Sequence, residues 1–295
     1  MVLVFGTVCL DRVRAVSAIP EIGDYVEATM TLDALGGEAA NTMLAIQALG
    51  GEAKLAGNPI GDDESGRLLQ KLMYQHGLQP TVRANLNTPV CTVYVTPNGE
   101  RTMVGEWFST MDSTPFMLPS IKDADWITTD SNMRRKSREL FVLAKKSTAK
   151  KYLMDFGADT DLPLIAACDV LQVSGSSISS APWHFCETMS GRFGCHTIVT
   201  RGAVGLCYCA PRKDAQEFPA FPCKRVVDTT GAGDQFRASM LYGLDEGMPM
   251  LECLKLAAAA GALKCATFGA STKSPSLSAV RRLIKANPEI AERYA

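Results

Sequence analysis

The chain has 295 residues, of which 46% are hydrophobic and 21% are charged, and its formal net charge at pH 7 is −1. A chain of this length can bury a sizeable core, and its composition is typical of a soluble globular protein with one large α/β domain or two small ones. The balanced charge excludes an overall surface for polyanions, so we expect no nucleic-acid partner.

The ten cysteines are scattered, form no CxxC pair, and in several cases lie within apolar runs. This pattern indicates buried free thiols in a reducing compartment. The first residues lack the basic start of a signal peptide, and no apolar run approaches the roughly 20 residues that a membrane helix requires. We therefore expect a cytoplasmic protein with no membrane partner.

A buried strand is predicted at residues 2–6, where an apolar run ends in glycine. We expect Asp11 in the loop that follows this strand. Ligands gather at the carboxyl ends of strands in an open parallel sheet, so this loop would place Asp11 where substrates bind. Taken alone, an Asp in such a loop is equally well a turn residue.

Gly36 and Gly37 open a predicted helix that runs to Leu49 and is closed by two further glycines. Paired glycines at the start of a helix allow another group to approach the backbone closely. Asn41 lies in the first turns, and its side chain can both donate and accept hydrogen bonds, which suits a polyol. An ordinary capped helix explains the same pattern equally well.

A hairpin is predicted at residues 91–104, because two strand-like runs flank the turn sequence Pro-Asn-Gly-Glu. A weakly alternating run at residues 25–32 predicts another strand, which is half-exposed. Both lie outside the strand–helix alternation of the chain. We therefore expect a small discontinuous β-sheet, from about residues 22–34 and 88–106, that covers the site as a lid.

The rest of the chain alternates between strands and helices, which predicts a parallel, doubly wound sheet. The alanine-rich last helix fits close packing beside a nucleotide. The predicted strands cover residues 53–56, 126–129, 152–154, 169–173 and 197–200, and the predicted helices cover about residues 65–76, 137–149 and 256–262.

The most specific stretch is RVVDTTGAGDQF at residues 225–236, where an apolar approach leads into Gly231, Ala232 and Gly233. A helix that begins at these residues leaves its first amides unpaired, so we call the three amides the anion cradle. That helix end carries about half a positive charge, which favours phosphate. Asp234 lies inside the cradle, where a carboxylate suits a general base facing a substrate hydroxyl.

The sequence DTTGAGD resembles the C-terminal signature of the ribokinase-like (PfkB-type) carbohydrate kinases. The likeness spans nearly the whole chain, and it extends to Gly36-Gly37 with Asn41, to the Gly-Asp-Asp turn that ends at Asp63, and to the hairpin. It implies a single domain of residues 1–295 with a three-layer α/β/α sandwich, a mostly parallel central sheet and a small β-sheet lid. It also implies ATP-dependent phosphorylation of a sugar or nucleoside hydroxyl with Mg²⁺.

The resemblance also implies roles for individual residues. Asp234 would be the general base, and its ordinary pKa of about 3.9 would leave it ionised at neutral pH. The amides of Gly231, Ala232 and Gly233 would hold the transferred phosphoryl group. Asp11, Gly37 and Asn41 would orient the sugar, Thr200, Gly202, Gly205 and Cys265 would line the nucleotide, and the carbonyls of Asp228 and Thr230 would hold a monovalent cation such as K⁺.

The chain departs from the family pattern after the strand at residues 169–173. Many members carry Asn-x-x-Glu there for Mg²⁺ and phosphate, whereas this chain reads Gln-Val-Ser-Gly-Ser-Ser from Gln172, although the ketohexokinase branch also has a serine here. Gln235 and Ser239 replace residues that are commonly smaller. The signature with Ala238-Ser239, followed by Leu-Lys-Cys at residues 263–265, looks most like ketohexokinases, which favours a ketose such as fructose as substrate.

Three other functions are considered. A nucleoside kinase of the adenosine type shares every motif above, and a family member that has lost catalysis would act by binding alone. A Rossmann oxidoreductase is disfavoured because Phe236 stands where its third glycine is needed. Because the edges of small sheets invite pairing, and because lid-to-lid dimers occur in the resembling family, we also expect a homodimer.

Overall fold

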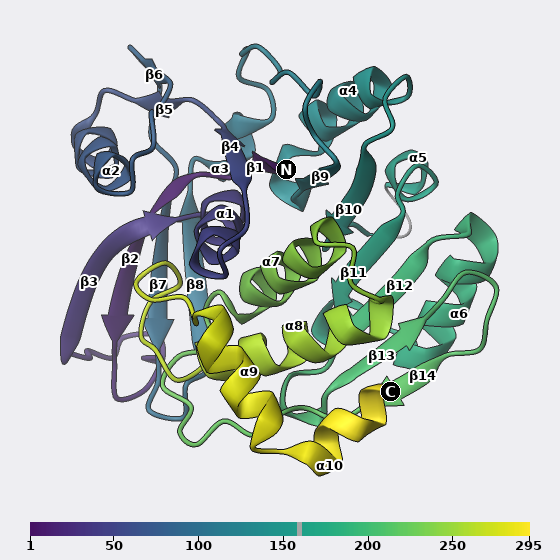
Figure 1. Cartoon of the computed structure of the whole chain (residues 1–295). Coiled ribbons are helices and arrows are strands. Elements are labelled where there is room, and N and C mark those ends of the chain that lie inside the picture. Colours follow the sequence, from purple (N-terminus) through teal and green to yellow (C-terminus); the bar gives the residue numbers. More distant parts are fainter. Residues whose placement is uncertain (158–160) are drawn as a thin grey trace.

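The computed structural model describes residues 1–157 and 161–295. Within these ranges the chain folds around an eight-stranded sheet with the order β14-β13-β12-β11-β10-β9-β1-β4 (Figure 1). Strands β1, β4, β9, β10, β11 and β12 pair in parallel and were all predicted. Strand β13 pairs antiparallel with β12, and β14 pairs antiparallel with β13. The strands are β1 Val2–Gly6, β4 Ala53–Gly57, β9 Trp126–Thr129, β10 Lys150–Met154, β11 Val170–Ser174, β12 His196–Thr200, β13 Leu206–Cys209 and β14 Gln216–Phe218.

Alternate side chains of β1 point to opposite faces of the sheet, and each face has its own apolar core. Val2 and Val4 belong to the core shared with α1, α7 and α8, whereas Leu3 and Phe5 belong to the core shared with α4, α5 and α6. The three-layer α/β/α fold is therefore confirmed. The helices are α1 Glu38–Ala48, α4 Arg134–Ala144, α5 Leu162–Ile165, α6 Pro182–Phe193, α7 Ala232–Asp245, α8 Met250–Lys264, and the C-terminal α9 Leu277–Lys285 and α10 Pro288–Ala291.

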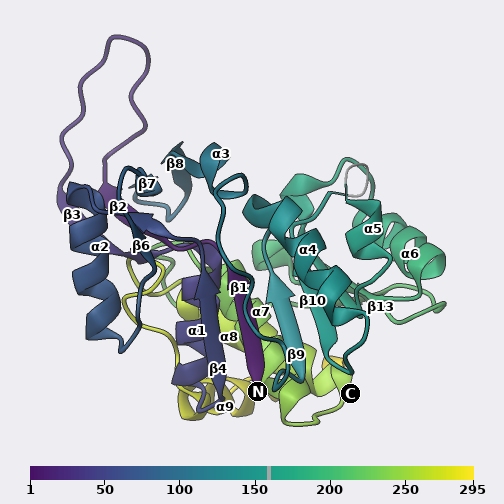
Figure 2. The same cartoon turned by 90° about the horizontal axis from the view of Figure 1, so that it is seen from above.

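A second sheet of four strands, which we call the lid, has the order β3-β2-β7-β8 and lies beside α1. The loop between β2 and β3 projects beyond the rest of the molecule (Figure 2). Helix α2 packs against β2 and β3. The lid strands are β2 Cys9–Ala15, β3 Met30–Gly36, β7 Val90–Val95 and β8 Arg101–Glu106, and α2 covers Glu64–Gln75. The remaining short elements are α3 Phe108–Met111, β5 Ile60–Gly61 and β6 Val82–Arg83.

The position of Asp11 corrects one prediction. Asp11 lies within strand β2 of the lid and not in a loop, and the strand expected at residues 25–32 instead covers residues 30–36. Cys9, Leu10 and Asp11 are all buried, because both faces of β2 are covered at this end. A strand of this kind lacks the alternation of polar and apolar residues by which strands are recognised in a sequence.

Helix α4 also differs from its prediction, because it covers residues 134–144 where residues 137–149 were expected. Its first turn is capped from far along the chain: the Asp112 carboxylate accepts hydrogen bonds from the amides of Arg135 at 2.7 Å and Lys136 at 2.9 Å. A cap of this kind satisfies amides that a helix start leaves unpaired, and it is invisible in the local sequence.

All ten cysteines are free thiols, and most of them are buried, as predicted. Several, such as Cys186 on α6 and Cys195 and Cys207 near the strands beside it, belong to the apolar core on that face of the sheet. None of the helices in the described parts of the chain is long and apolar enough to cross a membrane.

Candidate active site

The anion cradle is formed where the loop at residues 226–231 enters α7. Gly231 is the N-cap of α7 and has a left-handed backbone, with φ 77°. A Cβ at this position would lie 2.9 Å from the Ala270 side chain, so glycine is required for both reasons. The Ala232 amide donates to the Thr229 carbonyl at 3.3 Å, whereas the amides of Gly231 and Gly233 have no acceptor among the described residues. Two of the three expected amides are thus open to a ligand.

Asp234 lies in the first turn of α7, directly beside the open amides, and is 7% exposed. Its Oδ2 accepts a hydrogen bond from Asn41 Nδ2 on α1 at 2.9 Å. Its Oδ1 pairs with Arg237 Nη2, one helical turn further on, at 3.3 Å. The carboxylate is therefore held from two sides by groups that fix its orientation.

The pKa of Asp234 is raised to about 6: burial is the largest cause and the carboxylates of Asp130 and Asp155 add to it, whereas Arg237 and the Asn41 hydrogen bond lower it. The ordinary pKa assumed from sequence is thus wrong, because the surroundings of Asp234 are dry and acidic. Asp234 remains ionised at neutral pH. A base whose pKa lies nearer the working pH accepts a proton more readily from a hydroxyl.

Four acidic residues at the carboxyl edge of the sheet act on one another and form what we call the acid cluster: Glu38, Asp130, Asp155 and Asp234. Burial raises the pKa of both Glu38 and Asp130, and nearby carboxylates raise that of Glu38 further. Asp130 is partly compensated, because its carboxylate accepts hydrogen bonds from the Thr7 amide at 2.6 Å and hydroxyl at 2.9 Å. A nearby positive charge is therefore required to offset the repulsion between the carboxylates of the acid cluster.

Arg237 provides that charge, and the sequence analysis missed it. Its guanidinium is fully buried and donates to the Glu38 carbonyl at 2.8 Å, to the Thr42 hydroxyl at 2.9 Å and to the Thr129 carbonyl at 3.3 Å, in addition to Asp234. It also lowers the pKa of Asp130, Asp155 and Asp234. The available signal was an Arg in an otherwise apolar stretch of a buried helix, where an unpaired charge is not tolerated.

Asp11 approaches the same site from the lid. A Cβ on Gly36 would lie 2.1 Å from the Asp11 carboxyl carbon, so the first of the paired glycines leaves room for this carboxylate. Burial raises the pKa of Asp11 to about 7, and the charges of Asp234 and Asp228 contribute to the increase. Asp11 and Asp234 are thus close enough to repel each other across the site.

Asn41 and Gly37 complete the predicted acceptor side. Asn41 is 8% exposed, and although its amide group holds Asp234, its Oδ1 is buried without a hydrogen-bond partner. Such an atom is costly to leave unpaired, and a ligand hydroxyl would satisfy it. Gly37 has φ 94°, and a Cβ there would lie 2.3 Å from the Thr7 carbonyl oxygen. The structure therefore brings Asp11, Gly37 and Asn41 to one site with Asp234.

The turn of the lid hairpin lies directly on the loop that leads to the anion cradle. The Gly99 carbonyl accepts hydrogen bonds from the Thr229 amide at 3.2 Å and hydroxyl at 3.0 Å, and Arg101 Nη1 donates to the same hydroxyl at 2.8 Å. A Cβ on Gly99 would lie 2.4 Å from Val226 Cγ1. The lid and the cradle are thus joined without any intervening element.

The residues expected to line the nucleotide fall in two places. Thr200 is the last residue of β12, and Gly202 and Gly205 lie in the connection to β13, where Gly205 has φ 112° and a Cβ would meet the Phe218 carbonyl oxygen at 2.0 Å. Cys265 lies at the end of α8, and its carbonyl accepts from the amides of residues 227 and 228. No hydrogen bond in the described residues joins Thr200, Gly202 or Gly205 to the loop at residues 226–231 that leads to the anion cradle.

The two expected metal ions would use different ligands: side chains and substrate phosphates for Mg²⁺, and the main-chain carbonyls of Asp228 and Thr230 for K⁺. No group of three or more His, Cys, Asp or Glu side chains in the described residues is arranged to hold a metal ion. Around the predicted monovalent site, Asp228 Oδ1 accepts from the Thr230 amide and hydroxyl, and Oδ2 accepts from the Gly269 amide at 2.8 Å. Beyond β11, where Asn-x-x-Glu is missing, the Asp155 carboxylate of the neighbouring strand accepts from the Ser174 amide at 2.9 Å.

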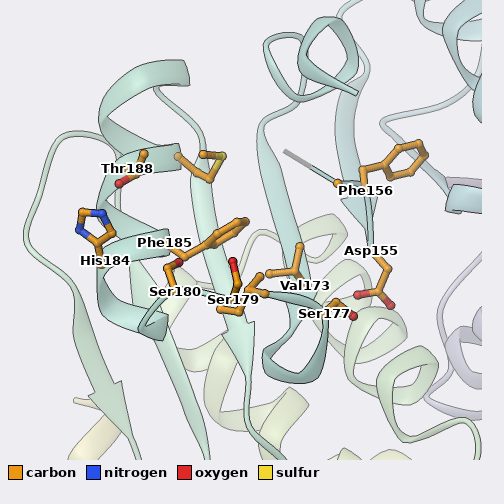
Figure 3. A pocket seen from close by; sticks show the side chains of 12 residues that line it. Asp155, Phe156, Val173, Ser177, Ser179, Ser180, His184, Phe185 and Thr188 are labelled. Carbon is orange, nitrogen blue, oxygen red and sulfur yellow. The ribbon is translucent and has the colours of Figure 1, made fainter. Parts of the chain in front are cut away.

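A cavity of about 500 Å³ opens at the carboxyl ends of β10 and β11, next to α6 (Figure 3). Asp155 and Ser177 lie at one end of it, and His184 and Thr188 lie at the other. Asp234 is not among the residues that line it. Asp155 therefore belongs both to the lining of the cavity and to the acid cluster.

A family model described as pfkB family carbohydrate kinase matches residues 1–277. An uncharacterized sugar kinase of Dictyostelium discoideum is 27% identical over 350 residues, which cover 96% of this chain and 97% of that protein. Aminoimidazole riboside kinase of Salmonella typhimurium is 28% identical over 279 residues, which cover 81% and 84%. Other matching relatives are named ribokinase, fructokinase and ketohexokinase.

The fold is that of a solved kinase. The structure of Arabidopsis thaliana ribokinase with ribose and ATP superposes with a TM-score of 0.80 and covers 96% of this chain and 98% of that one, at 21% sequence identity. At this identity the likeness bears on the fold alone, so the chemistry must come from the site.

Proposed function

We propose a function for the site from the premise that this chain belongs to the pfkB family of carbohydrate kinases. Membership implies an ATP-dependent phosphotransferase that acts on a sugar or a nucleoside. Within that class we propose that the acceptor is a ketose such as fructose. The support is the sequence likeness of residues 238–239 and 263–265 to ketohexokinases, and fructokinases and ketohexokinase stand among the named relatives.

The observation that carries the mechanism is the placement of Asp234, a buried carboxylate with a pKa of about 6, beside two open amides. In the proposed reaction Asp11 and Asn41 Oδ1 hold the acceptor, and Asp234 takes the proton of the attacking hydroxyl. The amides of Gly231 and Gly233 hold the oxygens of the phosphoryl group as it is transferred. The contacts of Gly99 and Arg101 with Thr229 support a role for the lid in closing the site.

Thr200, Gly202, Gly205 and Cys265 remain our proposed nucleotide contacts. Mg²⁺ usually binds through substrate phosphates and one or two carboxylates, and Asp155 is the carboxylate placed to serve it at the edge of β10. When bound, the metal would neutralise charge on the phosphates. We further propose one kinase domain over residues 1–295, a homodimer through the lid, and a cytoplasmic location, which is supported by the ten free thiols.

The substrate is tested with a panel of ketoses, aldoses and nucleosides, by measuring ATP consumption and locating the phosphate on the product. A ketose is expected to give the highest kcat/KM. A nucleoside kinase is the alternative, which the name of the Salmonella relative favours, and a clear preference for ribosides would establish it over the ketose proposal.

The role of Asp234 is tested by the substitution Asp234→Asn. Turnover should fall about 10²-fold or more, the scale of a lost general base, while melting temperature and ATP binding are retained. Asp62→Asn, on an exposed residue, is the control and should leave all three unchanged. Near-normal turnover of Asp234→Asn would rule out this assignment.

A further inference from the structure

Lys264, the last residue of α8, has an ammonium group in an unusual place. The side chain is 1% exposed, and its Nζ donates to the Gly269 carbonyl at 2.8 Å, the Thr267 hydroxyl at 3.0 Å and the Lys273 carbonyl at 3.2 Å. Three acceptors satisfy all three N–H donors of an ammonium. The loop at residues 265–273 is thus wrapped around a buried positive charge.

This charge is opposite Asp228, the first residue of the DTTGAGD signature. Gly269 connects the two groups, because its carbonyl accepts from Lys264 and its amide donates to Asp228 Oδ2. Burial lowers the pKa of Lys264 to about 8, and the carboxylates of Asp228 and Asp234 limit the decrease. The group therefore remains largely an ammonium at neutral pH.

The loop that Lys264 organises is in direct contact with the anion cradle. A Cβ built on Gly231 would lie 2.9 Å from the Ala270 side chain, so Ala270 packs directly against this glycine. The Cys265 carbonyl accepts from the amides of Val227 at 2.8 Å and Asp228 at 3.2 Å. On the other side, the Ser271 hydroxyl donates to the carbonyl of Leu35 in lid strand β3. The open amides of the cradle are therefore positioned by a loop whose own carbonyls converge on Lys264.

Main-chain carbonyls that converge next to a buried carboxylate are the ligands of a hard cation. Here the Lys264 ammonium already takes the carbonyls of Gly269 and Lys273, and both carboxylate oxygens of Asp228 already accept from protein donors. A K⁺ ion at the main-chain carbonyls of Asp228 and Thr230, where we expected it, would find these further ligands engaged and a buried positive charge nearby. The residues present thus do not complete a K⁺ site. We propose that the Lys264 ammonium replaces this ion, so that the anion cradle is ordered, and phosphoryl transfer proceeds, without any monovalent cation.

The proposal rests on the proposed kinase activity only for its catalytic part, so it is tested by stability as well as by turnover. Wild-type protein is compared in potassium, sodium and tetramethylammonium chloride at equal ionic strength. Turnover and melting temperature should agree among the three salts within about twofold and about 2 °C, because a salt effect that is not specific acts through screening alone. Severalfold activation or a marked stabilisation by potassium alone would overturn the proposal.

The substitution Lys264→Ala should remove the ammonium and open a site for a cation in its place. We expect turnover to fall about tenfold or more and the melting temperature to fall by several degrees. Potassium or methylammonium should restore both in a saturable manner, whereas tetramethylammonium, which is too large, should not. Lys255→Ala, which removes a lysine of the same helix that pairs with Glu252, is the matched control and should show no loss of turnover and no response to potassium.

Lys264→Met removes the ammonium but keeps much of the apolar stem, and it replaces Lys264→Ala in the test if that variant does not fold. This variant should lose turnover and show no response to potassium, because its side chain still fills the space. Normal turnover and melting temperature in Lys264→Met would overturn the proposal. A wild-type protein that phosphorylates no sugar or nucleoside would contradict the proposed function, and the melting temperatures in the three salts would still decide the role of Lys264.

Discussion

The charge of Asp234 depends on Arg237. This carboxylate lies in the acid cluster, where burial and the neighbouring Asp130 and Asp155 favour its protonated form, and the guanidinium is the counter-ion that opposes them. A catalytic base that is protonated cannot accept a proton from the acceptor hydroxyl. The residue one turn further along α7 therefore sets the pH range in which Asp234 can work, although we place it away from the reacting atoms.

We predict that Arg237→Met moves the acid limb of the kcat/KM profile to higher pH, because the pKa of Asp234 rises when the positive charge is lost. An adjacent opposite charge changes a carboxyl pKa by about 1–3 units, so kcat/KM at pH 6.5 should fall by about fourfold to eightyfold relative to its value at pH 8.5. Arg237→Lys keeps the charge and should restore most of the profile. A uniform loss at every pH would indicate a purely structural role.

Replacing Asp11 should weaken binding of the sugar and leave binding of ATP unchanged. Loss of a buried charged hydrogen bond costs about 1.5–3 kcal/mol, so Asp11→Ala should raise KM for the sugar roughly 10–150-fold and leave KM for ATP nearly unchanged. Steady-state kinetics with each substrate varied in turn make the measurement. If KM for ATP alone changes, the proposed division into acceptor and donor sides is reversed.

Asp11 also predicts a pH-dependent effect on stability. Its pKa in the folded protein is about 7, above its value in the unfolded chain, so the folded state retains a proton that the unfolded state has lost. This contribution to stability is present at low pH and is lost as pH rises through about 7. Asp11→Asn, which cannot ionise, should therefore gain more melting temperature relative to wild type at pH 8 than at pH 5.

Among the elements, the lid hairpin has the most direct contact with the anion cradle. Gly99 has φ 80° and lies against Val226, so Gly99→Ala should force the turn away from Thr229 and lower kcat/KM by about tenfold. Gly50→Ala is a matched control, because Gly50 has a similar φ of 92° and nothing within 4 Å. Both variants should lose stability from backbone strain, and only Gly99→Ala should lose activity.

At the scale of the whole molecule, the lid leaves apolar side chains uncovered. All six residues of edge strand β8 are exposed, including Met103 at 55% and Val104 at 54%, and Trp107 after it is 48% exposed. A small sheet with such a surface and an unpaired edge favours association with a second copy.

We therefore predict a homodimer in light scattering at micromolar concentration, with or without substrate. Val104→Arg should shift the mass toward that of a monomer, because a charge is introduced where the apolar surface would be buried. Val142→Arg, at a similarly exposed apolar residue on α4, is the control and should leave the mass unchanged. A monomer mass for the wild-type protein would contradict the prediction.

The sequence alone determined the six parallel strands of the large sheet, several of the helices that cover it and the position of Asp234 at the start of a helix. These features are local: apolar runs of strand length, helical periodicity, and glycines at Gly231 and Gly37 where the backbone has positive φ and no room for a Cβ. The hairpin was recognised for the same reason, because its turn sequence lies between its two strands. The likeness to a kinase family followed from residues that are adjacent in the chain.

Only the tertiary structure decided how the site is charged and held together. Strand β2 was missed because burial on both faces removes its alternation, and α4 began early because Asp112 caps it from a distance. The raised pKa of Asp234 and the contacts of its counter-ion Arg237 depend on burial and on partners far along the chain. The loop around Lys264 is local, but its placement against Asp228 also depends on the tertiary fold. Desolvation and Coulomb interactions act through space, so a pattern of neighbouring residues does not encode them.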